Sequence, residues 1–312
     1  MVRNRRAQLE ISAPKLRRVY APGLQVPPLY LHMFQEDARL YVAPLRSRGD
    51  EKFAVEINGE QGDVDRVEAL IESISRESYG NRQALFSEAI RQVATYLLWY
   101  GVARFELLDA RKGEENGYFA LQPFPSFGVW RVPGGFVQDV PKQFRDQNQK
   151  RFFWIPAGLV WTVHIPRQLG GTRRYRQMQR RLRQNTGFPT LQERALEEGK
   201  WSKLLDFSEF RAMSRSELLC STSLWGWAGR DSSLTYETEF YSVYRTIKFR
   251  WATAVLREHI TTEFNHLFKR LGLAAFISVQ GLSAPDAYNQ INQELSQGEI
   301  DFAQAYKLIN EA

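Results

Sequence analysis

The segment from Ala84 to Leu107 constrains the fold of this chain more than any other. Apolar residues recur at helical spacing in its first half, at Leu85, Ala89, Val93 and Leu97. Gly101 then breaks the pattern, and a strand-like segment follows with Val102, Arg104, Phe105 and Leu107. A helix that enters a strand across one glycine has to pack against the sheet that it begins. We therefore expect the fold to be organised around this helix–strand junction.

The composition is that of a globular protein rich in aromatic residues. The 312 residues can form one large or two modest domains, and 43% of them are hydrophobic. Eight Trp, thirteen Tyr and twenty Phe require broad packed surfaces or extensive subunit contacts. No apolar run is long enough to span a membrane, and the charged N-terminus lacks the apolar stretch of a signal peptide. The single Cys220 cannot form an internal disulfide, which fits a reducing compartment.

The net charge of +7 is concentrated in two regions. From Gln147 to Gln192 there is no Asp or Glu, against nine Lys and Arg. The first fifty residues hold nine basic and four acidic side chains. We therefore expect a localised basic surface and an acidic partner.

The chain is expected to divide into four consecutive segments. Residues 1–50 are predicted to be an arm, because Pro14, Pro22, Pro27, Pro28 and Pro44 interrupt any long element. Such an arm is expected to be ordered by lying either on its own body or on a neighbouring subunit. Residues 51–165 form an α+β body, with a strand near 53–57 and a helix at 64–76 before the junction. After Gly101 the pattern predicts short strands at 102–108, 118–122, 127–132, 136–140, 152–155 and 159–163.

The last two segments are mainly helical. Residues 166–235 contain predicted helices at 172–184, 189–203 and 207–219, then a glycine-broken aromatic loop around Trp225 and Trp227 that is expected to be core. Residues 236–312 begin with one long helix over 236–271, which would be on the order of 50 Å long. Gly272 ends it, a strand follows at 275–279, and Ser283 is expected to cap the next helix before a last one at 301–310.

The helix over 172–184 carries the strongest candidate site. Its six arginines are Arg173, Arg174, Arg176, Arg180, Arg181 and Arg183. Four of them stack along one side, whereas Tyr175, Met178 and Leu182 lie opposite. One interpretation is contact with phosphates, because guanidinium groups offer fork-shaped donors. The other is pairing with acidic residues such as Glu193, Glu197 and Glu198, and the pattern alone leaves both open.

No enzyme is supported by the remaining motifs. His259, Glu263 and His266 share one helical face and could hold a metal, but a solvated stripe on a long helix is the favoured interpretation. The chain has no nucleophile elbow, no Walker-type loop and no dinucleotide-binding glycine motif. We expect no cofactor and no metal.

Three stretches, taken in order, resemble the portal proteins of tailed bacteriophages. The first is the junction, where a helix ends in Tyr100-Gly101 and a strand follows (YGVARFE). The second places Pro123 and Phe127 before Ile155-Pro156, a His-ended strand (VWTVH, 160–164) and a glycine pair. The third ends the long helix (NHLFKRLG, 265–272), and a strand, an Asp-led helix and the run LSQGEI (295–300) follow it.

The resemblance implies a portal-like fold with a wing-like body at 51–165, a stem- or clip-like region at 166–235 and a long C-terminal helix. It further implies a homo-oligomeric ring, usually of twelve subunits, at one capsid vertex of the virion, assembled in the host cytoplasm. Double-stranded DNA would pass through its channel during packaging and ejection. The partners would be the major capsid protein, the terminase large subunit and a head–tail adaptor, with no membrane.

Two other functions compete with a portal. One is a sequence-independent nucleic-acid-binding protein, such as a replication or recombination factor, that uses the arginine-rich helix on DNA. The other is a cytosolic enzyme whose site short motifs do not reveal. A ring of about a dozen subunits would distinguish the portal from both.

Overall fold

The computed structural model describes residues 29–43, 54–74, 82–109, 119–124, 129–139, 151–185, 207–230 and 238–311. The fold mixes helix and sheet, which confirms the α+β class expected from the sequence. The chain forms two compact units, one from Ala43–His164 with His259–Gly281 and one from Val26–Val42, Ile165–Glu258 and Leu282–Ala312. Each unit thus combines parts of the chain that are distant in sequence. The division of the chain into four consecutive segments stays a prediction.

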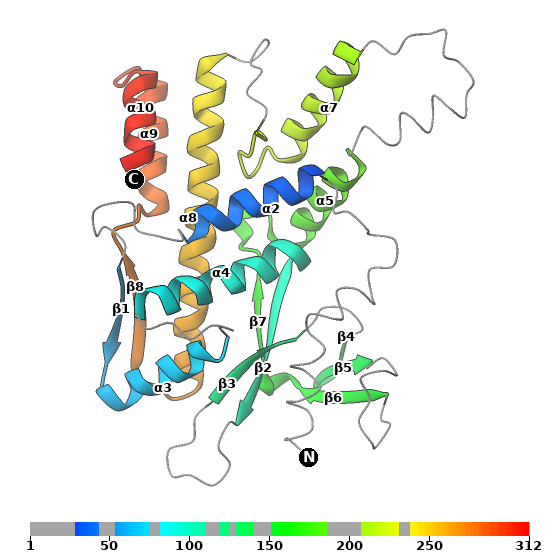
Figure 1. The fold of residues 1–312 in the computed structure, drawn as a ribbon, viewed down its shortest axis with the longest axis vertical. Coiled ribbons are helices and arrows are strands. Elements are labelled where there is room, and N and C mark those ends of the chain that lie inside the picture. Colours follow the sequence, from blue (N-terminus) through cyan, green and yellow to red (C-terminus); the bar gives the residue numbers. More distant parts are fainter. Residues whose placement is uncertain are drawn as a thin grey trace, which may run out of the picture. The chain divides into compact units, whose positions relative to one another are not determined.

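The junction at Gly101 forms as expected in the first unit. Helix α4 (Arg82–Tyr100) enters strand β2 (Val102–Asp109), as Figure 1 shows. Gly101 adopts φ 72°, a left-handed conformation that suits glycine, and its N–H donates to the Leu97 carbonyl at 2.7 Å. Leu97 and Phe105 are fully buried, so the helix end and the strand share one core.

Strand β2 is the centre of an antiparallel sheet. It pairs with β3 (Phe119–Pro123) on one side and β7 (Val160–His164) on the other. Just before β7, the chain passes through the short helix η2 (Ala157–Leu159). The alternating apolar residues of the three segments predicted these strands to within a few residues.

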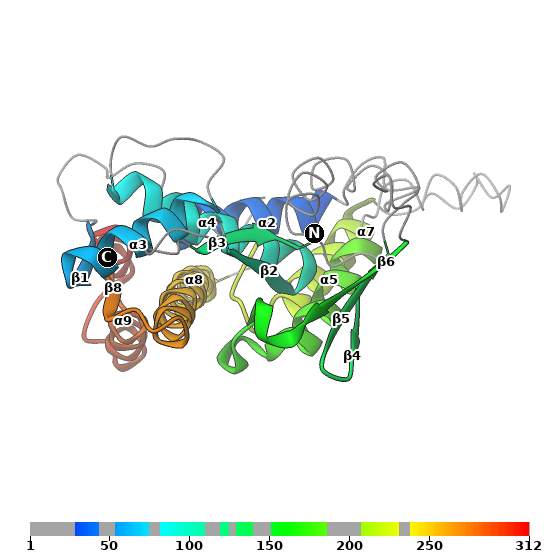
Figure 2. The same cartoon turned by 90° about the horizontal axis from the view of Figure 1, so that it is seen from below.

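A second sheet of the first unit is unusual for its exposed aromatic face. It consists of β4 (Val129–Val132), β5 (Gly135–Asp139) and β6 (Phe152–Pro156), seen side by side in Figure 2. Trp130, Val137 and Trp154 are direct neighbours across its three strands. Trp130 is 51% exposed and Trp154 54%, and Phe152, two residues before Trp154 on the same face, is 51% exposed. On the opposite face, Phe136 and Ile155 are buried and pack with Phe124 and Val160.

A two-stranded ribbon joins distant parts of the first unit. Strand β1 (Ala54–Gly59) precedes helix α3 (Gln61–Glu72) and pairs antiparallel with β8 (Ala275–Gln280), as Figure 1 shows. The Asn265 side chain fixes β8 to the long helix, because its amide donates to the Ile277 carbonyl at 2.9 Å and accepts from the Ile277 N–H at 2.8 Å.

The segment expected to be an arm instead contains a helix of the second unit. Helix α2 (Leu29–Val42) spans 14 residues, so the prediction of no long element was wrong for this part of residues 1–50. The prolines flank the helix rather than interrupt it, since Pro27 and Pro28 precede its first turn and Pro44 follows its end. Helix α2 packs on its own chain: the Phe34 ring is fully buried and lies 5.3 Å from the Trp225 ring and 5.6 Å from the Trp227 ring, centroid to centroid.

The aromatic loop is core, as predicted. It follows helix α7 (Phe207–Ser221), and both Trp225 and Trp227 are buried. Arg245, itself buried in helix α8 (Glu239–Arg270), holds the loop. Its guanidinium donates to the Leu219 carbonyl at 3.1 Å, to the Thr222 hydroxyl at 2.8 Å and to the Trp227 carbonyl at 2.6 Å. Three such bonds offset much of the cost of burying the charge.

Gly226 is the position where this loop tolerates no side chain. Its φ is 77°, and an added Cβ would lie 2.6 Å from the Phe249 nitrogen and 2.7 Å from the Arg245 carbonyl oxygen, both backbone atoms. We expect Gly226→Ala to lower the free energy of unfolding by at least about 3 kcal/mol in urea titrations. Gly272→Ala is the matched control: it has φ 75° and no atom within 4 Å, so only the conformational cost of about 1–2 kcal/mol applies. Equal losses in the two variants would contradict the packing argument.

The long helix and the C-terminal helices complete the second unit. Helix α8 is one unbroken helix of 32 residues, as expected, and its final part belongs to the first unit. Within the second unit its apolar residues pack with α9 (Pro285–Gln297) and α10 (Phe302–Glu311). The predicted Ser283 cap was wrong: α9 begins at Pro285, so Ala284 takes the cap position, and the Ser283 carbonyl accepts from Arg257 at 2.6 Å. None of the helices in the described ranges has the length and apolar character needed to cross a membrane.

Candidate nucleic-acid interface on helix α5

Helix α5 (Gly171–Gln184) presents the predicted arginines to solvent. It follows the short helix η3 (Arg167–Leu169) across Gly170, whose φ is 85°. Its buried residues are Tyr175, Met178, Gln179 and Leu182. All six arginines are exposed, so the predicted division of the helix into an apolar and a basic side is confirmed.

The apolar side fixes α5 against the aromatic cluster of the second unit. The Tyr175 ring centroid lies 5.5 Å from that of Trp225 and 6.3 Å from that of Phe34. Burial raises the pKa of the Tyr175 hydroxyl far above its usual range, although hydrogen bonds with Gln179 and Gln35 oppose the shift. The phenol therefore stays neutral, and the helix is anchored by a hydrogen-bonded, fully packed side chain.

The far end of α5 is held by a reciprocal contact. The Asn185 amide donates to the Ser214 carbonyl at 2.9 Å, and the Ser214 hydroxyl donates back to the Asn185 side-chain oxygen at 3.0 Å. Both ends of the helix are thus tied to the body of the unit. The backbone of a helix fixed in this way needs no further ordering when its side chains bind a partner.

The arginines occupy two different edges of the helix. At about 100° per residue, Arg173 and Arg180 point outermost, and Arg176 and Arg183 lie on one flank. Arg174 and Arg181 lie on the other flank. The helix therefore offers an open basic stripe of four arginines (Arg173, Arg176, Arg180 and Arg183) and a separate pair.

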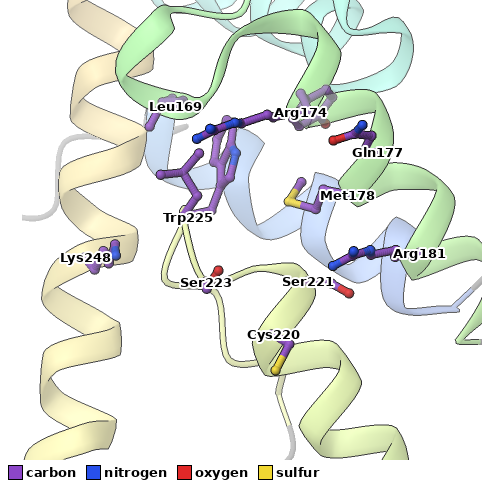
Figure 3. Close-up of a pocket in the computed structure, with 12 residues that line it drawn as sticks. Leu169, Arg174, Gln177, Met178, Arg181, Cys220, Ser221, Ser223, Trp225 and Lys248 are labelled. Atoms are coloured by element: carbon purple, nitrogen blue, oxygen red, sulfur yellow. The ribbon is translucent and has the colours of Figure 1, made fainter.

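The separate pair lines a pocket of about 360 Å³ between α5, α7, the loop after α7 and α8. Figure 3 shows Arg174 extending past Trp225 and Arg181 extending toward Ser221 at the end of α7. Lys248 of α8 adds a third cation, and Ser221 and Ser223 add hydroxyls. No carboxylate lines this pocket, so its chemistry suits a phosphate oxygen. Sequence reasoning missed Lys248 because no spacing relates α8 to α5.

The competing interpretation, internal ion pairing, stays a prediction. Glu193, Glu197 and Glu198 lie outside the described residues, as does the predicted helix at 189–203. Among the ion pairs formed between described residues, none involves Arg173, Arg174, Arg180 or Arg181.

The histidines weighed as metal ligands make other contacts. The His259 Nε2 lies 2.9 Å from the His164 carbonyl oxygen, a hydrogen-bond distance, and the His266 Nδ1 lies 3.7 Å from a Glu263 carboxylate oxygen. Within the described ranges, no three His, Cys, Asp or Glu side chains gather as a metal would require. Cys220 is exposed at the rim of the α5 pocket.

The candidate interface is thus a packed helix with an open basic stripe on one side and a basic pocket on the other. Nucleic-acid backbones are the partners that such sequence-independent basic surfaces suit.

Compared with protein-family models, curated proteins and solved structures, the chain matches none of them.

Proposed function

We propose that this protein is a portal protein of a tailed bacteriophage, a ring of identical subunits through which double-stranded DNA passes. In this role the ring, with twelve subunits as the expected number, occupies one vertex of the capsid and contacts the major capsid protein. The terminase large subunit docks on it during packaging, and a head–tail adaptor binds afterwards. The chain itself carries out no catalysis, because the motor's chemistry belongs to the terminase.

One observation carries the proposal: an anchored helix that presents an open stripe of four arginines. A conduit has to attract the phosphate backbone without reading base sequence and without stopping its movement. Exposed guanidinium groups on a single helix face provide weak, distributed and salt-dependent contacts. Repeated around a ring, the stripe would become stacked basic rings.

The aromatic face of the β4-β5-β6 sheet supports the assembly part of the proposal. Trp130, Trp154 and Phe152 expose more than half of their surface on this face. Such large apolar side chains at a surface mark interfaces more often than isolated apolar residues do, and Trp is enriched among the residues that dominate binding energy. A neighbouring subunit is the partner that a ring supplies for this face.

This assignment predicts the effect of two substitutions on assembly. Trp130→Ser together with Trp154→Ser should weaken the ring, with each tryptophan contributing on the order of 2 kcal/mol per subunit contact. Light scattering at decreasing protein concentration measures the dissociation. Phe276→Ser is the control, since Phe276 is 53% exposed on the separate β1–β8 ribbon. An unchanged ring in the double variant would show that subunits meet elsewhere.

Native mass spectrometry and negative-stain imaging of the purified full-length chain test the function. A closed ring of about a dozen copies with a central channel is the expected result. A monomer or dimer that binds DNA in a salt-sensitive manner would overturn the portal and favour the second candidate, a sequence-independent nucleic-acid-binding factor. That candidate is supported by the α5 pocket, because a pocket with three cations suits a static phosphate contact.

A further inference from the structure

The first unit contains a second basic pocket, to which α5 contributes no residue. It has a volume of about 570 Å³ and lies where the β3-β2-β7 and β4-β5-β6 sheets approach each other. The polar residues that line it are Arg104, Arg131, Thr162 and His164. The proposed DNA contacts use none of these side chains.

Two strands of one sheet place three of the four polar groups together. Arg104 of β2 lies directly opposite Thr162 of β7 in the antiparallel register, and His164 follows two residues later on the same face. Arg131 comes from β4, in the other sheet. The two sheets therefore bring their cationic groups to one cavity, an arrangement that no helical or strand periodicity reveals.

The electrostatics of His164 report a positive potential in this cavity. Burial lowers the pKa of the His164 imidazole, and the charges of Arg104, Arg131 and His259 lower it further. Glu263 of α8 acts in the opposite sense but does not outweigh them. An anion bound in the pocket would raise the pKa of the His164 imidazole and so favour its protonated form.

The rest of the wall is apolar or plain backbone. Phe136 and Val160 are buried, and Pro133, Ala157 and the Gly134–Gly135 turn line the remainder. The Arg104 guanidinium carbon lies 5.6 Å from the centre of the Phe136 ring. A pocket of this volume with apolar walls and a few convergent polar groups is the usual form of a small-molecule site.

We propose that this pocket binds a small organic anion, a phosphate monoester with an aromatic or aliphatic body. The phosphate contacts Arg104, Arg131 and His164, with Thr162 as an additional donor. The organic part lies against Phe136 and Val160. The site is independent of the proposed portal function, and of the DNA contacts on α5.

Titration calorimetry with phenyl phosphate on the full-length protein tests the site. We expect saturable binding at one site per chain, with inorganic phosphate binding more weakly because it lacks the apolar part. Arg131→Gln should weaken binding at least about tenfold, whereas Arg131→Lys should retain part of it. Lys269→Gln, at an exposed position that does not line this pocket, is the control and should leave phenyl phosphate binding unchanged. Equal affinity in wild type and Arg131→Gln, or no saturable binding at millimolar phenyl phosphate, would overturn the proposal.

The pH dependence provides an independent readout. Benzenesulfonate keeps the same charge across the neutral range, so its affinity should rise as the pH falls and His164 becomes protonated. His164→Gln should remove this rise while leaving the arginine contribution. A rise that persists in His164→Gln would contradict the role of this residue. Displacement of phenyl phosphate by a short DNA duplex would assign the pocket to the DNA backbone and overturn the small-molecule proposal.

Discussion

Replacing Arg173, Arg176, Arg180 and Arg183 together by Gln is expected to lower affinity for duplex DNA by at least about 100-fold at low salt. These four side chains form the open stripe of α5, and all four are exposed to solvent. The slope of the logarithm of affinity against the logarithm of salt concentration should become shallower by about 3 to 4 for a single chain on DNA, since up to four counterions are no longer released. Fluorescence anisotropy across a salt series measures both quantities.

The matched control removes the same charge elsewhere. Arg39, Arg66, Lys269 and Lys307, all at least partly exposed and outside α5, can be replaced together by Gln. This variant should lose only the weak contribution of net charge. Ring assembly should survive in both variants. Loss of the ring in the α5 variant alone would mean that these arginines hold subunits together, and equal DNA binding in both would remove the argument for α5 as the interface.

Truncating Phe34 to Ala is expected to lower the free energy of unfolding of the second unit by about 3–5 kcal/mol. The ring is fully buried and lies within 6.5 Å, centroid to centroid, of the rings of Tyr175, Trp225, Trp227 and Phe249. Its removal leaves a cavity at the point where α2 meets α5 and the aromatic loop. Urea unfolding followed by tryptophan fluorescence measures the change, because Trp225 and Trp227 report on this cluster.

Leu40→Ala, on the same helix, is the control variant. It separates the stability lost with buried contacts from the stability change caused by altered helix propensity. Leu40 is 39% exposed, so its truncation should cost less than about 1 kcal/mol. A small effect of Phe34→Ala, comparable to that of Leu40→Ala, would mean that α2 is not part of the core of its own chain. Comparing the two variants therefore shows whether α2 is part of the core of the second unit or an arm that binds another subunit.

The sequence predicted those elements whose signal is local. The junction at Gly101 follows from helical spacing, one glycine and an alternating apolar pattern. The helix, the left-handed glycine and the strand are all present as expected. The basic and apolar sides of α5 follow from the same 3.6-residue periodicity. Burial of Trp225 and Trp227 was also predicted, since large aromatic side chains at a glycine-rich turn are most stable in a core.

The sequence could not reveal features that depend on tertiary contacts. The prolines around α2 indicate breaks, but only the aromatic cluster shows that a helix packs between them. The presence of Arg174, Arg181 and Lys248 around one pocket depends on how their helices are arranged within the second unit. The convergence of Arg104, Arg131 and His164 requires the register of one sheet and the position of another. Proximity of this kind leaves no trace in residue spacing.

The β1–β8 ribbon has a consequence for the order of events during synthesis. Glu56 and Gln280, 224 positions apart, are joined across it by a side-chain hydrogen bond of 2.6 Å. At a translation rate of about 5–20 residues per second, β1 leaves the ribosome on the order of 10–45 s before its partner strand. During that interval β1 has unpaired backbone groups that another nascent chain could bind. Chaperone capture of truncated chains ending before β8 would therefore be stronger than capture of chains that include it.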